Sequence, residues 1–106
     1  MTDVGFLALP EFVDLNAGAT ANEAEILMHL GEIDLAEGRV TAARRTLEES
    51  LTAFRSLKEP HDKEPRAIRA LAKVLRRQGN PQAAQERDAE AAKLEAAAKA
   101  RAAAAG

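Results

Sequence analysis

The feature that most constrains this chain is an internal repeat with an interval of 41 residues. Shifting the sequence by that interval places apolar and small residues on residues of the same kind: Leu27 on Ile68, Leu30 on Leu71, Gly31 on Ala72, Ile33 on Val74, Gly38 on Gly79, Ala42 on Ala83 and Ala43 on Ala84. Repeated units of this size bury their faces against neighbouring units. The sequence therefore predicts two copies of one supersecondary unit within its 106 residues.

Each unit is predicted to be helical. The chain contains 25 Ala, and its only aromatic residues are three Phe. Ala, Leu, Glu, Arg, Gln and Lys favour helices, whereas the β-branched and aromatic residues that favour strands are scarce. We therefore expect an all-α fold. The absence of Cys excludes disulfides, thiol catalysis and thiolate metal sites.

The first unit carries start and stop signals for two helices. Thr20 and Glu23 form a capping box ahead of an apolar pattern at helical spacing, and Gly38 is a natural C-terminal cap. The apolar residues of that pattern are Ile26, Leu27, Leu30 and Ile33. The second helix is predicted over residues 41–57, because the Lys-Glu-Pro run after it disfavours helical backbone.

The second unit repeats this plan. Asp62 is predicted to cap its first helix, with Pro65 in the first turn and Gly79 at the end. Asn80 and Pro81 then restart the chain as N-cap and first helical residue. The last helix is predicted over residues 81–104. Its final third is rich in Ala, so we expect it to project from the stack or fray.

These signals divide the chain into four segments: an N-terminal arm over residues 1–19, a first repeat over 20–60, a second over 61–95 and an Ala-rich helical extension over 96–106. The arm concentrates apolar residues, and Phe6, Leu9 and Phe12 are predicted to pack on the helical stack or on a second copy. The alternative is that the arm is a docking peptide for a partner.

The repeated pattern resembles the tetratricopeptide repeat, in which W-x2-L-G-x2-Y is followed by A-x3-F. The first unit reads Leu27-x2-Leu30-Gly31-x2-Asp34, then Ala43-x3-Leu47, and the second reads Ile68-x2-Leu71-Ala72-x2-Leu75, then Ala84-x3-Asp88. Asp34 and Asp88 depart from the pattern. The interval exceeds the usual period by about seven residues, as in repeats of the kinesin light chain type. The small residues at Gly31 and Ala43 are expected where two antiparallel helices cross closely.

Charge is distributed unevenly along the chain. Residues 1–38 hold eight acidic residues and no Lys or Arg, while residues 39–106 hold all 15 basic residues and nine acidic ones. A basic stripe lies on one arc of the first helix of the second unit: Arg66, Arg69, Lys73, Arg76 and Arg77. The apolar residues Ile68, Leu71 and Leu75 lie on the opposite arc. Such asymmetry indicates either an interaction with another molecule or internal neutralisation.

The resemblance implies that the first helix of each repeat lines a concave surface. It would place the basic stripe there, beside the equivalent residues of the first repeat: Glu25, Met28, Glu32, Leu35 and Ala36. The implied function is a non-enzymatic protein-interaction module that binds an acidic or C-terminal peptide, with Arg69 and Lys73 contributing most. The competing interpretation is that Glu25 and Glu32 neutralise the stripe.

Two other function classes stay open: a structural or self-associating repeat segment of a larger bacterial regulatory protein, and nucleic-acid binding by the basic helix. A net charge of −2 and the lack of aromatic residues near the stripe disfavour nucleic acid. His29, His61, Ser50 and Ser56 show no catalytic or metal-ligand spacing. We therefore expect no enzymatic activity, metal or cofactor. The N-terminus lacks a basic signal-peptide region, so a cytoplasmic location is expected.

Overall fold

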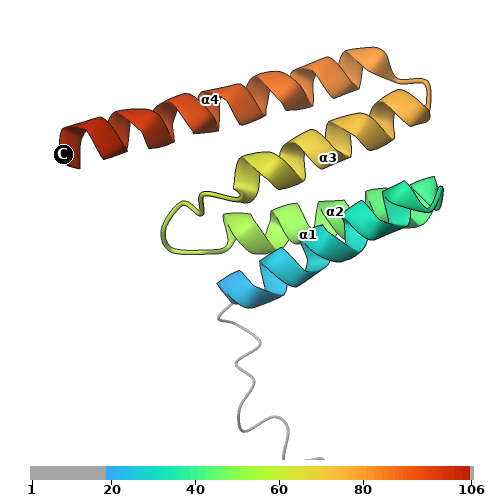
Figure 1. Ribbon diagram of the computed structural model, residues 1–106, viewed down its shortest axis with the longest axis horizontal. Helices are drawn as coiled ribbons and strands as arrows, with labels where there is room; N and C mark the ends of the chain where they lie inside the picture. The colour runs from blue at the N-terminus through green and yellow to red at the C-terminus, as the bar shows by residue number, and fades with distance from the viewer. Residues whose placement is uncertain (1–18, 106) are drawn as a thin grey trace, which may run out of the picture.

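The computed structural model describes residues 19–105, which form four α-helices and no strand. Helix α1 spans Ala21–Ala36, α2 spans Val40–Arg55, α3 spans Glu64–Arg77 and α4 spans Pro81–Ala105. Consecutive helices run antiparallel, so α1 with α2 and α3 with α4 make two helical hairpins that stack side by side (Figure 1). The all-α prediction is confirmed. The predictions for Phe6, Leu9 and Phe12 lie outside the described residues.

The helix ends follow the local signals closely. Glu23 N–H donates to the Thr20 hydroxyl, and the Glu23 carboxylate accepts from Thr20 N–H, which completes the capping box. Gly38 and Gly79 have φ angles of 84° and 78°, the left-handed conformation that glycine adopts without strain. After each glycine the next backbone N–H bonds back five residues, from Arg39 to Asp34 and from Asn80 to Leu75. Both turns are therefore Schellman caps.

The start of α3 differs from the prediction. The residue before the helix is Lys63, which offers no side-chain cap, and Asp62 is exposed one position earlier. Lys63 N–H donates instead to Nδ1 of His61 at 3.0 Å. The turn is thus organised by the histidine ring, and the prediction of Asp62 as N-cap is wrong. At the start of α4, by contrast, the Asn80 side chain accepts from Ala83 N–H as expected.

The core lies between helices that follow one another in the chain. Its largest fully buried side chains are Phe54, Met28, Leu47, Ile68 and Val74. A Cβ atom added to Gly31 would lie 2.5 Å from Leu47 Cγ, which shows how closely α1 approaches α2. The expected close crossing at Gly31 is confirmed.

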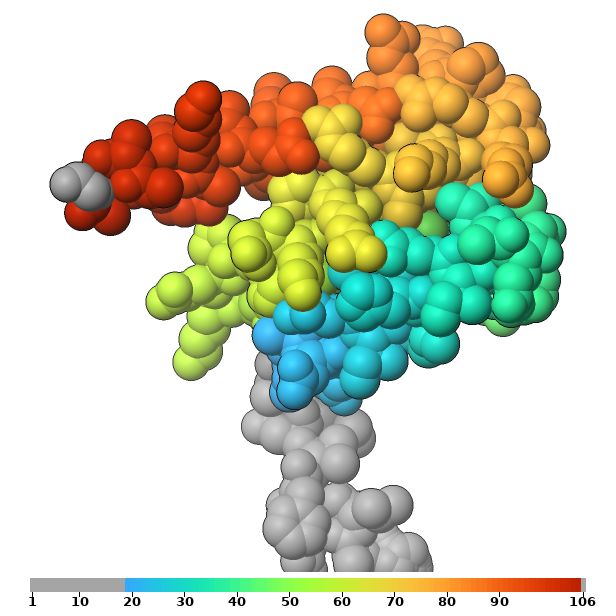
Figure 2. Space-filling view, viewed as in Figure 1, coloured from blue at the N-terminus to red at the C-terminus, as the bar shows by residue number. Residues whose placement is uncertain are grey.

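The buried face of α1 is not the one with the largest apolar residues. Ala24, Met28, Gly31 and Leu35 are buried, whereas the larger side chains of the same helix, Ile26, Leu30 and Ile33, are exposed. At the other end of the chain, α4 continues beyond α3 and overhangs the stack (Figure 2). Most side chains after Glu95 are exposed, so this extension projects and stays helical to Ala105.

Candidate functional site

A hollow of about 740 Å³ lies between α1 and α3, the first helices of the two hairpins. Its walls carry charged groups from both helices, and Glu95 of α4 closes one edge. The residues that line it are Glu32, Leu35, Ala36, Asp62, Pro65, Arg66, Arg69, Ala70, Lys73, Arg77 and Glu95. In Figure 2 the side chains of α3 stand out between α1 and α4. We call this hollow the groove.

The helical rotation of α3 divides the basic stripe in two. At about 100° of rotation per residue, Arg66, Lys73 and Arg77 point in directions within about 40° of one another around the helix axis. Arg69 and Arg76 are rotated by about 60–80° from Arg66. That difference turns Arg69 and Arg76 toward α4. The Arg69 guanidinium reaches Glu95 at 2.6 Å and Asp88 at 3.6 Å, and Arg76 also pairs with Asp88. These two arginines join the helices of the second hairpin, and Arg69 lowers the pKa of Glu95 through its hydrogen bond.

The cations nearer α1 follow a different pattern. Arg66 forms a two-pronged pair with Glu32, with Nε to Oε2 at 2.7 Å and Nη2 to Oε1 at 2.8 Å. This ion pair joins the two repeats. Glu32 therefore neutralises Arg66, one member of the basic stripe. Among residues 19–105, Lys73 and Arg77 are the stripe members that contact no carboxylate. Arg77 donates only a long bond of 3.5 Å to the Leu35 carbonyl.

Two residues that we expected in the groove are used elsewhere. Met28 is fully buried, so it belongs to the core and that prediction is wrong. Glu25 does not meet the basic stripe, because its carboxylate binds the turn before α3. It accepts from Lys63 Nζ at 3.0 Å and lies 2.9 Å from His61 Nε2. Sequence spacing gave no signal for this contact, since Glu25 and Lys63 are 38 residues apart.

The Glu25 contact makes stability depend on pH. The hydrogen bond from Lys63 holds the pKa of Glu25 below its ordinary value of 4.5. A depressed folded-state pKa means that this carboxylate stabilises the fold above the unfolded-state value, and that the contribution is lost as pH falls through the folded-state value. We expect Glu25→Gln to lower the melting temperature at pH 7, and the difference from the wild type to shrink as pH falls below 4.5, as measured by circular dichroism. Glu59→Gln, in the exposed part of the same turn, is the control. A deficit that stays constant from pH 7 down to the lowest pH at which the chain remains folded would contradict the prediction.

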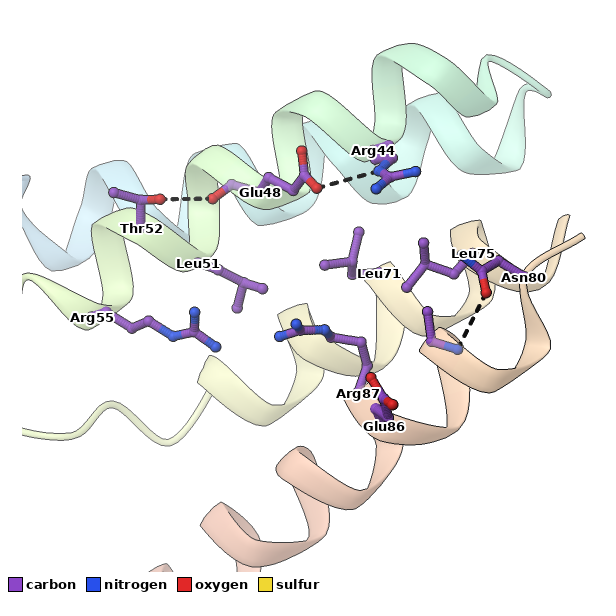
Figure 3. Close-up of a pocket in the computed structure, with 11 residues that line it drawn as sticks. Arg44, Glu48, Leu51, Thr52, Arg55, Leu71, Leu75, Asn80, Glu86 and Arg87 are labelled. Carbon is purple, nitrogen blue, oxygen red and sulfur yellow. Dashed lines mark hydrogen bonds and ion pairs between the residues drawn. The ribbon is translucent and has the colours of Figure 1, made fainter. Parts of the chain in front are cut away.

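A second hollow, of about 290 Å³, lies on the side formed by α2, α3 and α4. Figure 3 shows Leu51 and Leu71 near its apolar part, with Arg55 and Arg87 extending toward it. Its arginines are already paired. Arg55 and Arg87 both contact Glu90, at 2.6 and 2.7 Å, and Arg44 contacts Glu48 at 3.3 Å. This hollow therefore has less capacity to attract an anion than the groove.

The described residues bring together no group of three or more His, Asp and Glu that would hold a metal ion. None of the helices within residues 19–105 combines the length and the apolar character required to span a bilayer. The groove combines apolar side chains with two cations, Lys73 and Arg77, that contact no carboxylate within residues 19–105.

Comparison with known proteins agrees with this architecture. The family model for the tetratricopeptide repeat matches residues 22–96, which include α1, α2, α3 and the first part of α4. The search of curated proteins found no match, and the search of solved structures found none either. Repeats of this family mediate contacts between proteins. The match over residues 22–96, together with two stacked helical hairpins and the close crossing at Gly31, shows that this chain belongs to the tetratricopeptide repeat family.

Proposed function

We propose that the groove binds an extended, acidic peptide segment, or the free C-terminus of a protein, through Lys73 and Arg77. The observation that carries this proposal is the pairing pattern of the basic stripe. Arg66, Arg69 and Arg76 have carboxylate partners within the fold, whereas Lys73 and Arg77 have none among residues 19–105. These two side chains are exposed and lie one turn apart on the same line of α3.

The rest of the groove suits an extended chain. Leu35, Ala36 and Ala70 offer apolar contact beside the two cations, and the groove is also lined by three carboxylates, those of Glu32, Asp62 and Glu95. An extended peptide places alternate side chains about 6–7 Å apart, so a carboxylate at one position and an apolar side chain at another can be held together. These three carboxylates would repel a peptide with acidic residues along its whole length. We therefore expect a ligand with one or two carboxylates next to apolar residues.

Arg69 is less available than the sequence alone suggests, because Glu95 and Asp88 hold its guanidinium. Lys73 and Arg77 therefore replace Arg69 and Lys73 as the residues expected to contribute most to binding. Each charge-assisted hydrogen bond to a carboxylate contributes roughly 1.5–3 kcal/mol. Losing one such contact corresponds to about tenfold or more in the dissociation constant.

The test starts from a library of random octapeptides displayed with free C-termini. We expect selection on the full chain to enrich sequences that combine a carboxylate with apolar residues. Binding of a selected peptide should weaken with rising salt, because the contacts are exposed. The double variant Lys73→Glu, Arg77→Glu should reduce affinity by roughly a hundredfold, at tenfold for each cation, with unchanged helicity.

The matched control changes the same charges on α4. Lys93 and Lys99 are exposed there and do not line the groove. The variant Lys93→Glu, Lys99→Glu should bind the selected peptide as the wild type does. If both double variants lose affinity equally, net charge rather than the groove explains binding, and the proposal fails. Selection of peptides without any acidic preference, including at the C-terminus, would also contradict it.

A further inference from the structure

The outer face of α1 carries an exposed apolar ridge formed by Ile26, Leu30 and Ile33. These residues are 57%, 49% and 50% exposed, and they are the large hydrophobic residues exposed to this degree within residues 19–105. They lie on one line of the helix, opposite the face that packs on α2. Three neighbouring apolar side chains on one face form a contiguous patch, which is a typical feature of an interaction surface.

The second repeat shows what normally covers this face. The residues 41 positions later are Ala67, Leu71 and Val74, and their exposed fractions are 0%, 4% and 0%. Helix α3 lies between α2 and α4, whereas α1 contacts α2 and, to a smaller extent, α3, and no helix of the described residues packs on its outer face (Figure 1). The ridge is therefore a helix-packing surface whose neighbouring helix is missing from residues 19–105.

The chain itself contains a segment of suitable composition and reach. Residues 6–15 carry Phe6, Leu7, Leu9, Phe12, Val13 and Leu15, and the described chain begins at Ala19, directly before α1. The ridge spans about 10 Å of helix and starts about 9 Å beyond Thr20, at a rise of about 1.5 Å per residue. Ten residues span about 15 Å as a helix, or about 33 Å as a strand. Three residues, 16–18, are available to reverse the chain direction.

The carboxylates beside the ridge already have partners within the described chain, although the segment itself carries Glu11 and Asp14. The carboxylates next to the ridge on α1 are Glu23, Asp34 and Glu37. Glu23 accepts from Thr20 N–H at 2.7 Å, and Arg39 pairs with Asp34 at 2.8 Å and with Glu37 at 2.5 Å. Covalent attachment also favours the chain's own segment over a second copy, because a short tether gives an effective concentration in the millimolar range.

We propose that residues 6–15 pack on the ridge of their own chain. They would cover α1 in the way that α2 covers the equivalent face of α3. The contact is independent of the groove and of peptide binding. It would close the exposed end of the stack, which a chain of two repeats otherwise leaves open. Phe12 is its central residue, since it lies in the middle of the apolar segment.

The first test uses the natural absence of cysteine. Phe12→Cys is combined with Leu30→Cys in one full-length variant and with Arg45→Cys, on the exposed side of α2, in the control. Under mild oxidation we expect the ridge pair to form a disulfide within one chain, visible as a faster band without reductant and as a linked tryptic peptide. The control pair should stay reduced. A disulfide between two chains, or equal rates in both variants, would overturn the proposal.

The second test does not depend on cysteine geometry. In the full chain, Phe12→Ser and Leu30→Ser should each lower the melting temperature by roughly 5 °C or more. The double variant should melt close to the single variants, because either change already removes the same contact. Leu30→Ser would be nearly silent on a free helix surface. An unchanged melting temperature for Phe12→Ser, or additive effects of the two changes, would show that the segment and the ridge do not meet.

Discussion

Phe54→Ala is expected to lower the free energy of unfolding by about 3–5 kcal/mol, the usual cost of removing a buried Phe side chain. Phe54 is 1% exposed and is the largest fully buried side chain of the described chain. It lies at the end of α2, and its ring centroid is 5.1 Å from that of His61 in the turn before α3. The cavity would therefore open where the two hairpins meet. Because domains have stabilities of about 5–15 kcal/mol, a large part of the stability would be lost.

The measurement is urea denaturation followed by circular dichroism, since the chain lacks Trp and Tyr for fluorescence. The transition midpoint should fall while its slope stays similar. Phe54→Leu keeps much of the volume and should cost less than about 1.5 kcal/mol beyond wild type. Arg45→Ala, on the exposed side of the same helix, should leave the midpoint nearly unchanged. A Phe54→Ala midpoint equal to that of Arg45→Ala would contradict the packing described here.

Gly31→Val is expected to destabilise the first hairpin by about 1–3 kcal/mol, the typical cost of overpacking a core. A β-carbon at this position would lie 2.5 Å from Leu47 Cγ and 2.7 Å from Leu47 Cδ2. Val adds two further methyl groups at the same crossing. Glycine is about 1 kcal/mol less favourable in a helix than alanine. Replacing Gly31 therefore gains some free energy from helix propensity, but the overpacking against Leu47 costs more.

A double-variant cycle separates these two effects. In a Leu47→Ala background the atoms that the new side chain meets are gone, so Gly31→Val should be neutral or stabilising there. The double variant would then be more stable than the sum of the two single effects predicts. Gly38→Val is an informative comparison, because no atom lies within 4 Å of its added Cβ and its φ is 84°. Its cost would come from backbone strain and would not respond to Leu47→Ala. Equal costs for Gly31→Val in both backgrounds would contradict the close crossing.

Much of the fold could be predicted from the sequence, because its signals are local. The capping box at Thr20 and the glycine turns at Gly38 and Gly79 act within a few residues. The 41-residue interval adds long-range information, since it pairs Gly31 with Ala72 and so marks where helices cross. These features determine the number, order and direction of the helices.

The exposed face of α1 could not be predicted in the same way. Ile26, Leu30 and Ile33 follow the helical spacing that usually marks a buried face, yet the contact with α2 uses Ala24 and Gly31. Closely packed helices place small residues at their contact. A prediction from hydrophobic periodicity follows the large apolar residues, so it does not identify a buried face made of small ones. Within residues 19–105 no helix packs on that face of α1, so the larger side chains are exposed there.

The composition of the groove was predictable only in part. The basic stripe and its neighbours Glu32 and Leu35 come from helical spacing and the repeat interval. The partners of Arg69 are Glu95 and Asp88, which lie on α4. Helix α4 is rich in Ala and has little amphipathic pattern, so its rotation, and with it the pairing of Arg69, follows from tertiary packing.

Within residues 19–105, each helix packs only against helices that are one or two positions away in the order of the chain. Helix α1 does not pack against α4. Chains whose contacts join nearby residues form them with little loop-closure entropy and generally fold in microseconds to milliseconds. Each hairpin can therefore assemble before the other is complete. Since α2 and α3 form the main junction between the hairpins, the slowest event in folding should be the docking of two preformed hairpins, with Phe54 at the junction.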